Sequence, residues 1–195
     1  MKMNANATGR FLRAGVVALL AALITLLART GHAPAAHAQV EMQKGMSYAT
    51  WWSGSYSTPD ADLALAHLAD TGANWVSIIV TQYQDNLNST AIAPTAGTPT
   101  DADVIHAITE AHQLGLKVML KPHVDLWADP THWRGEIGGG FNATQWNAWF
   151  TSYRTFINHY AALAEAQAVE QFAVGVELSQ TEAQEAHWRT TIAGV

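Results

Sequence analysis

The 195-residue sequence contains no cysteine. A protein without cysteine cannot use disulfides, so a packed hydrophobic core has to hold it together. Hydrophobic residues make up 49% of the chain, which is an ordinary share for a globular domain. The composition therefore predicts a folded protein that depends on its core.

Basic residues are also few. The sequence has 10 lysines and arginines against 16 aspartates and glutamates, giving a formal net charge of −6. Nucleic-acid binding needs a basic face, so this balance argues against a nucleic-acid partner. Beyond residue 40 no apolar run is long enough to cross a membrane.

Motifs for several other classes are missing. The stretch Thr50-Trp51-Trp52-Ser53-Gly54 is not the glycine-rich phosphate loop of a dinucleotide-binding fold. No G-x-S-x-G nucleophile elbow occurs. His123 and Asp125 could supply two metal ligands, but no third ligand has convincing spacing. We therefore expect no metal and no cofactor.

The first 38 residues are predicted to form an export signal. Lys2, Arg10 and Arg13 precede an uncharged, mostly apolar run over residues 14–28, and Ala36-His37-Ala38 offers a small-residue cleavage site. A membrane anchor is the alternative, but the run is shorter than the ~20 residues that a spanning helix needs. The mature chain, residues 39–195, would begin near Gln39 and be secreted or periplasmic.

After the signal, a strand, a loop and a helix recur four times within one domain. Strands are expected near residues 45–50, 75–80, 116–121 and 172–176. Helices are expected from Thr58 to Gly72, from Thr100 to Gly115, over 143–166, and from about Thr181. Pro59 suits a first helical turn, and Thr100 with Asp103 resembles a capping box. The stripe of aromatic residues along 143–166 is interpreted as core.

Alternating strands and long helices favour a parallel sheet built through right-handed crossovers. The fold class is therefore α/β, and we predict the first four βα units of an eight-unit TIM barrel, which takes roughly 250 residues when complete. An open, doubly wound sheet is the alternative. In a barrel, the loops at the carboxyl ends of the strands carry the chemistry.

Glu177 follows the apolar run Phe172-Ala173-Val174-Gly175-Val176 and would stand at that edge. Glycoside cleavage needs one carboxyl group to protonate the departing oxygen and a second to attack or to activate water. The structural alternative is a carboxylate that caps the next helix or pairs with an arginine such as Arg189.

Two segments resemble a known family. Residues 172–178 with His187-Trp188-Arg189, and Lys121-Pro122-His123-Val124-Asp125 with Trp133-Arg134-Gly135, are similar to the fourth- and third-strand regions of the family 113 glycoside hydrolases, which are β-mannanases of the retaining barrel clan. The resemblance implies a retaining hydrolase acting on a β-linked polysaccharide such as mannan. It also implies that Glu177 is the acid/base. In this clan an asparagine often precedes that glutamate, and in this sequence Val176 occupies the position.

The nucleophile of that family follows the seventh strand, for which this sequence has no counterpart. We therefore expect the chain alone to be inactive, as the amino-terminal half of a barrel. The alternatives are a non-catalytic carbohydrate-binding relative or a truncated gene product. Its oligomeric state is left open, since two copies could associate through their exposed sheet edges.

Other residues at this edge are candidates for substrate binding. Asp125 is expected to contact a sugar hydroxyl, although it could lie at inverting distance from Glu177. His123 could bind sugar or be structural, and Arg134 could bind a substrate oxygen or pair with Asp125 or Glu136. Tryptophan faces stack on sugar rings, but the default interpretation of any single tryptophan is packing. One or two of four candidates are expected to stack on sugar: Trp51, Trp52, Trp127 and Trp133.

Overall fold

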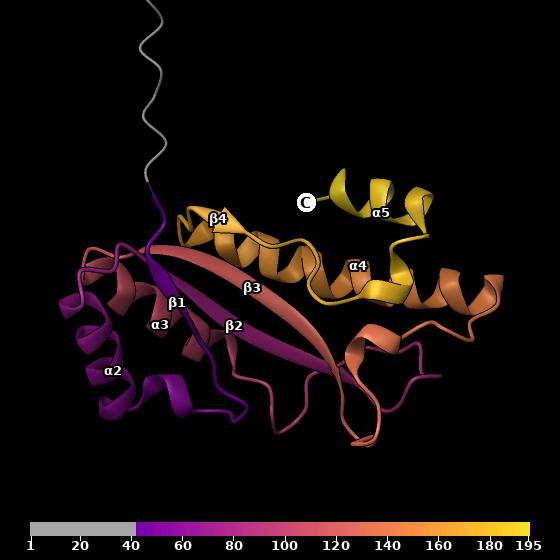
Figure 1. Cartoon of the computed structure of the whole chain (residues 1–195), viewed down its shortest axis with the longest axis horizontal. Helices are drawn as coiled ribbons and strands as arrows, with labels where there is room; N and C mark the ends of the chain where they lie inside the picture. The colour runs from indigo at the N-terminus through magenta and orange to yellow at the C-terminus, as the bar shows by residue number, and fades with distance from the viewer. Residues whose placement is uncertain (1–41) are drawn as a thin grey trace, which may run out of the picture. The chain divides into compact units, whose positions relative to one another are not determined.

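The computed structural model describes residues 42–195, and the predicted export signal lies outside them. Residues Gln43–Val195 form one unit, in which four parallel strands stand side by side in the order β1-β2-β3-β4 (Figure 1). The strands are β1 (Gly45–Tyr48), β2 (Trp75–Gln84), β3 (Lys117–Leu126) and β4 (Gln171–Phe172). The predicted parallel α/β arrangement is confirmed.

A helix follows each strand, and the sequence explains where most of them begin. The helices are α2 (Pro59–Asp70), α3 (Asp101–Gln113), α4 (Ala143–Ala166) and α5 (Glu185–Ile192), with short 3₁₀ turns η1 (Ser55–Ser57), η2 (Arg134–Glu136) and η3 (Ser179–Thr181). Thr58 caps α2 through a hydrogen bond from the Ala61 backbone N–H, with Pro59 at the first helical position. The capping box predicted at Thr100 and Asp103 is present. No helix within residues 42–195 has the length and apolarity to cross a membrane.

Asp103 also joins the first two βα units. Its carboxylate accepts hydrogen bonds from the Gly54 backbone N–H at 2.9 Å and from the Ser57 hydroxyl at 2.7 Å. Burial opposes ionisation, but the hydrogen bonds from Ser57, Gly54 and Thr100 outweigh it and lower the pKa of Asp103 to about 2. This contact fixes the loop that carries Trp51 and Trp52.

Alternation along the strands separates two faces of the sheet. Val76, Ile78, Val118 and Leu120 are buried in the core against the helices. The aromatic stripe of α4 joins the same core, which confirms its interpretation as packing: Trp146, Trp149, Phe150, Tyr153, Phe156, Ile157 and Tyr160. The opposite face, which would be the interior of a closed barrel, is more polar.

Strands β2 and β3 run four and five residues further than expected. Their register pairs Thr81 with His123 and Tyr83 with Asp125, so His123 and Asp125 belong to the strand and not to the following loop. Successive odd positions point to one face of a strand. His123 and Asp125 therefore lie on the open face, at the carboxyl edge.

The prediction of a fourth strand running up to Glu177 was wrong. Only Gln171 and Phe172 pair with β3, and a last backbone hydrogen bond joins the Ala173 N–H to the Leu120 carbonyl at 3.0 Å. The chain then leaves the sheet, so Glu177 lies in an irregular segment. The helix expected near Thr181 also begins later, since η3 precedes α5.

Candidate active site

The site centres on Arg134, which η2 places over the carboxyl end of β3. Its Nη2 donates to Asp125 Oδ2 at 2.6 Å, and its Nη1 lies 2.5 Å from His123 Nδ1. Its Nε lies 3.7 Å from Glu177 Oε2, which is an ion pair beyond hydrogen-bond distance. Three predicted site residues, His123, Asp125 and Glu177, are therefore brought together by a fourth.

These distances rank the partners of Arg134. The contact with Asp125 is a short hydrogen-bonded ion pair, whereas Glu177 is held loosely and its side chain is 46% exposed. Of the two ion-pair alternatives for Arg134, the structure contains the one with Asp125. Glu136 instead accepts a hydrogen bond from the Trp133 backbone N–H, at 3.3 Å.

The contact with Arg134 fixes the protonation of His123. A guanidinium can only donate hydrogen bonds, so His123 Nδ1 accepts and the ring is neutral with its proton on Nε2. Burial and then the positive charges of Arg134 and Lys121 lower the pKa of His123 to about 4. Its Nε2 is buried with no hydrogen-bond partner among residues 42–195. His123 thus acts as a neutral support for the guanidinium.

Glu177 has a strained backbone, which sequence reasoning missed. Its φ of +56° lies in the left-handed region, at a cost of roughly 1–2 kcal/mol for a residue other than glycine. The flanking carbonyls are held in place: Val174 accepts from the Tyr153 hydroxyl at 2.7 Å, and Leu178 accepts from the Thr181 hydroxyl at the same distance. Strain of this kind, kept by its surroundings, is commonest at functional sites.

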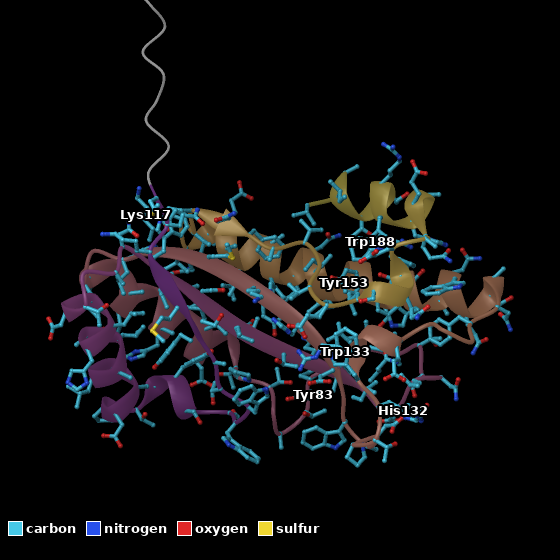
Figure 2. The ribbon with its side chains drawn as sticks, in the orientation of Figure 1. Tyr83, Lys117, His132, Trp133, Tyr153 and Trp188 are labelled. Atoms are coloured by element: carbon cyan, nitrogen blue, oxygen red, sulfur yellow. The ribbon has the colours of Figure 1, made fainter. Side chains whose placement is uncertain are left out.

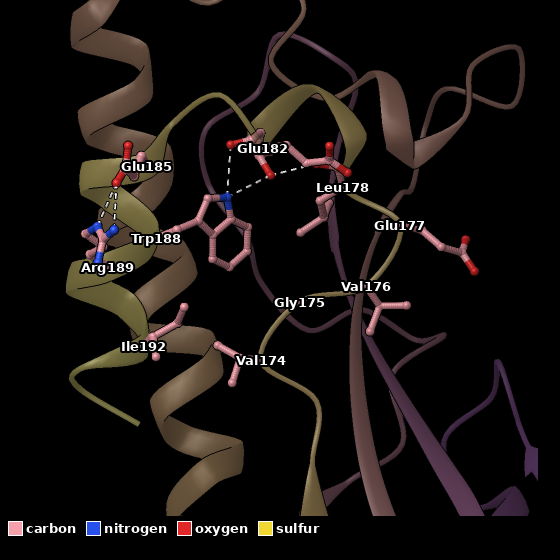
Figure 3. Close-up of a pocket in the computed structure, with 11 residues that line it drawn as sticks. Val174, Gly175, Val176, Glu177, Leu178, Glu182, Glu185, Trp188, Arg189 and Ile192 are labelled. Carbon is pink, nitrogen blue, oxygen red and sulfur yellow. Dashed lines mark hydrogen bonds and ion pairs between the residues drawn. The ribbon is translucent and has the colours of Figure 1, made fainter.

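Trp188 fixes the same segment from α5. Its Nε1 donates to the Thr181 carbonyl at 2.9 Å, and its ring lies so close to Gly175 that a Cβ there would be 2.8 Å from it. A cavity of about 620 Å³ lies between this segment and α5, and Figure 3 shows the Glu177 side chain directed away from Trp188. The alternative pairing of Glu177 with Arg189 is absent, because Arg189 binds Glu185 at 2.8 Å.

The predicted tryptophans surround the carboxyl edge. Trp51, Trp52, Trp127 and Trp133 are each about half to two-thirds exposed. Trp133, labelled in Figure 2, packs over Gly135. A Cβ at Gly135 would come within 2.2 Å of the Trp133 ring, so glycine is required beside it. Exposed rings at this edge are available for stacking on sugar.

Within residues 42–195, no group of three or more histidine, aspartate or glutamate side chains could hold an ion. His106 and His112 make separate contacts, with Asp62 at 2.8 Å and with Glu170 at 3.2 Å.

Comparison with known proteins decides the family. The sequence profile of Glycoside Hydrolase Family 113 matches residues 46–195. The chain belongs to this family. Among curated proteins no significant match was found.

Solved structures of family 113 agree. The β-mannanase AaManA from Alicyclobacillus acidocaldarius is 34% identical with a TM-score of 0.72, over 78% of this chain and 50% of that chain. A family 113 β-1,4-mannanase is 31% identical with a TM-score of 0.71, over 79% and 52%. A complex of a family 113 β-1,4-mannanase is 29% identical with a TM-score of 0.70, over 78% and 51%.

The chain therefore spans about half the length of these mannanases. Its parallel sheet and alternating helices are the first four βα units of a (β/α)₈ barrel, as predicted. The open face that carries His123 and Asp125 corresponds to the barrel interior, and the Arg134 cluster lies at the end where barrel enzymes place their active sites.

Proposed function

We propose that this glycoside hydrolase acts on a β-linked mannan by the retaining mechanism, with Glu177 as its acid/base. One observation carries the proposal. Glu177 is held in a strained backbone at the carboxyl edge of the barrel, exposed and only loosely paired with Arg134. The family 113 relatives are β-mannanases, which supports mannan as the substrate class.

In this mechanism, protonated Glu177 gives its proton to the glycosidic oxygen as the bond to the anomeric carbon breaks. A second carboxylate attacks that carbon from the opposite face, and water later releases the sugar while Glu177 takes a proton back. The family resemblance implies that the second carboxylate follows the seventh strand. We infer that it comes from the other half of the barrel, not from the four βα units described.

Asp125 is then a positioning residue. Its carboxylate holds Arg134 at 2.6 Å and draws the guanidinium away from Glu177, which leaves the Glu177 carboxyl group free to turn toward a substrate. His123 supports the same guanidinium from the other side. Trp51, Trp52 and Trp133 remain proposed stacking surfaces for sugar.

An external nucleophile can replace the absent carboxylate and so test this proposal. The chain is incubated with aryl β-mannosides and azide, which attacks the anomeric carbon as the bond to the aryl oxygen breaks. The expected products are a phenol, which takes the proton of Glu177, and α-mannosyl azide, because a single displacement inverts the configuration. Without azide, and with mannan, we expect little or no turnover. If azide yields no mannosyl azide, or if the chain alone hydrolyses mannan robustly, the proposal that the acid/base and the nucleophile lie in different halves of the barrel is wrong.

We also propose that the protein is exported through residues 1–38. The charged start, the apolar run and Ala36-His37-Ala38 support this. Expressed with its native amino terminus in a bacterial host, the protein should collect outside the cytoplasm and start near Gln39 on amino-terminal sequencing. Ala38→Leu should block cleavage, whereas Ala35→Leu is the control. An uncleaved, membrane-associated product of the unaltered chain would instead support the anchor alternative.

A further inference from the structure

A groove of about 550 Å³ opens beside the active-site cluster, between the loop after β2 and the end of β3. Tyr83 and Trp127 give it aromatic walls, and its rim comes from the loop after β2, with polar side chains at Asp85, Asn88, Ser89, Thr90 and Thr95. Asp85 and Asn88 are exposed there, and their side chains make no hydrogen bond or ion pair with other residues in the range 42–195. The groove thus combines an aromatic surface with uncommitted polar groups.

The loop that forms this groove is rigidly supported. Gln84 is buried, and its Nε2 donates to the carbonyls of Asn86 at 2.8 Å and Ser89 at 3.0 Å. Its Oε1 accepts from the buried Trp149 Nε1 at 2.7 Å. Every hydrogen-bonding atom of this amide is therefore used to tie the loop to the core, and a loop shaped in advance binds at a lower entropic cost.

Trp127 is fixed in the groove but remains accessible. Its backbone N–H donates to the Gln84 carbonyl at 2.8 Å, and its ring meets Tyr83 edge-on at 5.1 Å between centroids. The side chain is still 48% exposed. Gly97 closes over the pair, since a Cβ at this position would lie 2.9 Å from the Tyr83 hydroxyl and 3.0 Å from Trp127.

The groove continues directly from the proposed active site. Tyr83 is the register partner of Asp125, and Trp127 follows Asp125 by two residues, or ~7 Å along an extended chain. Asp125 in turn binds Arg134, the partner of Glu177. A chain of sugars crossing the Arg134 cluster along this edge would reach Trp127 next.

We propose that this groove is a remote subsite for one sugar unit of a β-linked hexose oligosaccharide. The sugar stacks on the exposed face of Trp127 while its hydroxyls donate to the Asp85 carboxylate and contact the Asn88 amide. The chemistry of the ligand rests on the proposed function, but binding in the groove needs neither Glu177 nor a nucleophile.

Calorimetric titration of the chain with mannobiose and mannohexaose tests the subsite. The longer ligand is expected to bind more tightly, because only it spans both the Arg134 cluster and the groove. Asp85→Ala removes an exposed carboxylate without disturbing packing and should weaken mannohexaose ~10-fold, as expected for a hydrogen bond to a charged group. Trp127→Ala should have at least the same effect, with Trp127→Phe intermediate.

Two controls separate this proposal from the proposed function. Asp70→Ala removes an exposed aspartate at the end of α2 and should leave binding unchanged. Glu177→Gln should retain mannohexaose binding whether or not Glu177 is the acid/base. The subsite is ruled out if the unaltered chain binds no oligosaccharide, if affinity does not rise with length, or if Asp85→Ala behaves like Asp70→Ala.

Discussion

Glu177→Gln should slow azide-dependent cleavage of an aryl β-mannoside with a poor leaving group by ~10²–10⁴-fold, the range for loss of a general acid. Glutamine matches glutamate in shape but has no acidic proton to transfer to the departing oxygen. A mannoside whose phenol is strongly acidic needs no such proton, so its cleavage should change little. Phenol release from the two substrates, followed by absorbance, measures the contrast.

The difference between the two substrates identifies Glu177 as the general acid. A residue that only shapes the site would slow both substrates alike when replaced. Glu182→Gln is the matched control, because Glu182 is an exposed carboxylate five residues further along the same segment. Equal loss with both substrates in Glu177→Gln would show that Glu177 supports the fold or binds sugar and does not protonate the leaving group.

Glu177 can be recognised in the sequence, but the residues that surround it in the fold, above all Arg134, cannot. The apolar run before Glu177 and the Trp188-Arg189 pattern single out the residue. Its closest cation, however, is 43 positions away and is placed by η2, a turn with no strong sequence signal. Only the folded chain shows that Asp125 and Arg134 bind each other.

The helix boundaries were largely predictable because their signals are local. Thr58 with Pro59, and Thr100 with Asp103, fix helix starts through contacts within three residues. The strand boundaries were not predictable, because the length of a strand depends on how far the adjacent strand continues to pair with it. Polar residues such as Gln84 and His123 look like loop, yet β2 and β3 support each other through them. β4 pairs over two residues only, and distant side chains such as Tyr153 then decide the path to Glu177.

The groove at Trp127 also depends on contacts between residues that are distant in the sequence. The sequence marks Trp127 as one of four possible stacking surfaces and leaves a loop between the strand expected near 75–80 and the helix expected from Thr100. It does not show that the buried Gln84 amide orders that loop, nor that Asp85 stays unpaired beside the ring. A glutamine in a strand gives no sign of its partners, since those come from Asn86, Ser89 and a tryptophan on α4.

His123 should make the native state lose stability as the pH falls from about 6.5 toward 4. Its pKa is about 4 in the folded chain, against 6.5 when unfolded, so the unfolded state binds the proton first. The contribution is complete above pH 6.5 and disappears as the pH falls through the folded pKa. It is on the order of 3 kcal/mol, since one pKa unit corresponds to ~1.4 kcal/mol.

His123→Asn isolates this contribution. Asparagine can still accept from Arg134 through an oxygen close to the position of Nδ1, but it does not titrate, so the pH dependence between 6.5 and 4 should flatten. Urea unfolding across this range measures it, and subtracting the variant's curve from that of the unaltered chain removes the shared titration of the carboxylates. The smaller stability expected at pH 7, from the lost ring volume, does not affect the slope.

His132→Asn is the control with the opposite sign. His132 is exposed, and its hydrogen bond with Asp129 raises its pKa, so any stability it provides is present at low pH and is lost as the pH rises. Arg134→Met should raise the pKa of His123 only in part, because burial, the larger cause, remains. Nitrogen NMR shifts of His123 at pH 6 give a direct test: a neutral ring with its proton on Nε2 is expected, and an imidazolium there would contradict the hydrogen bond from Arg134 on which the geometry of the whole site depends.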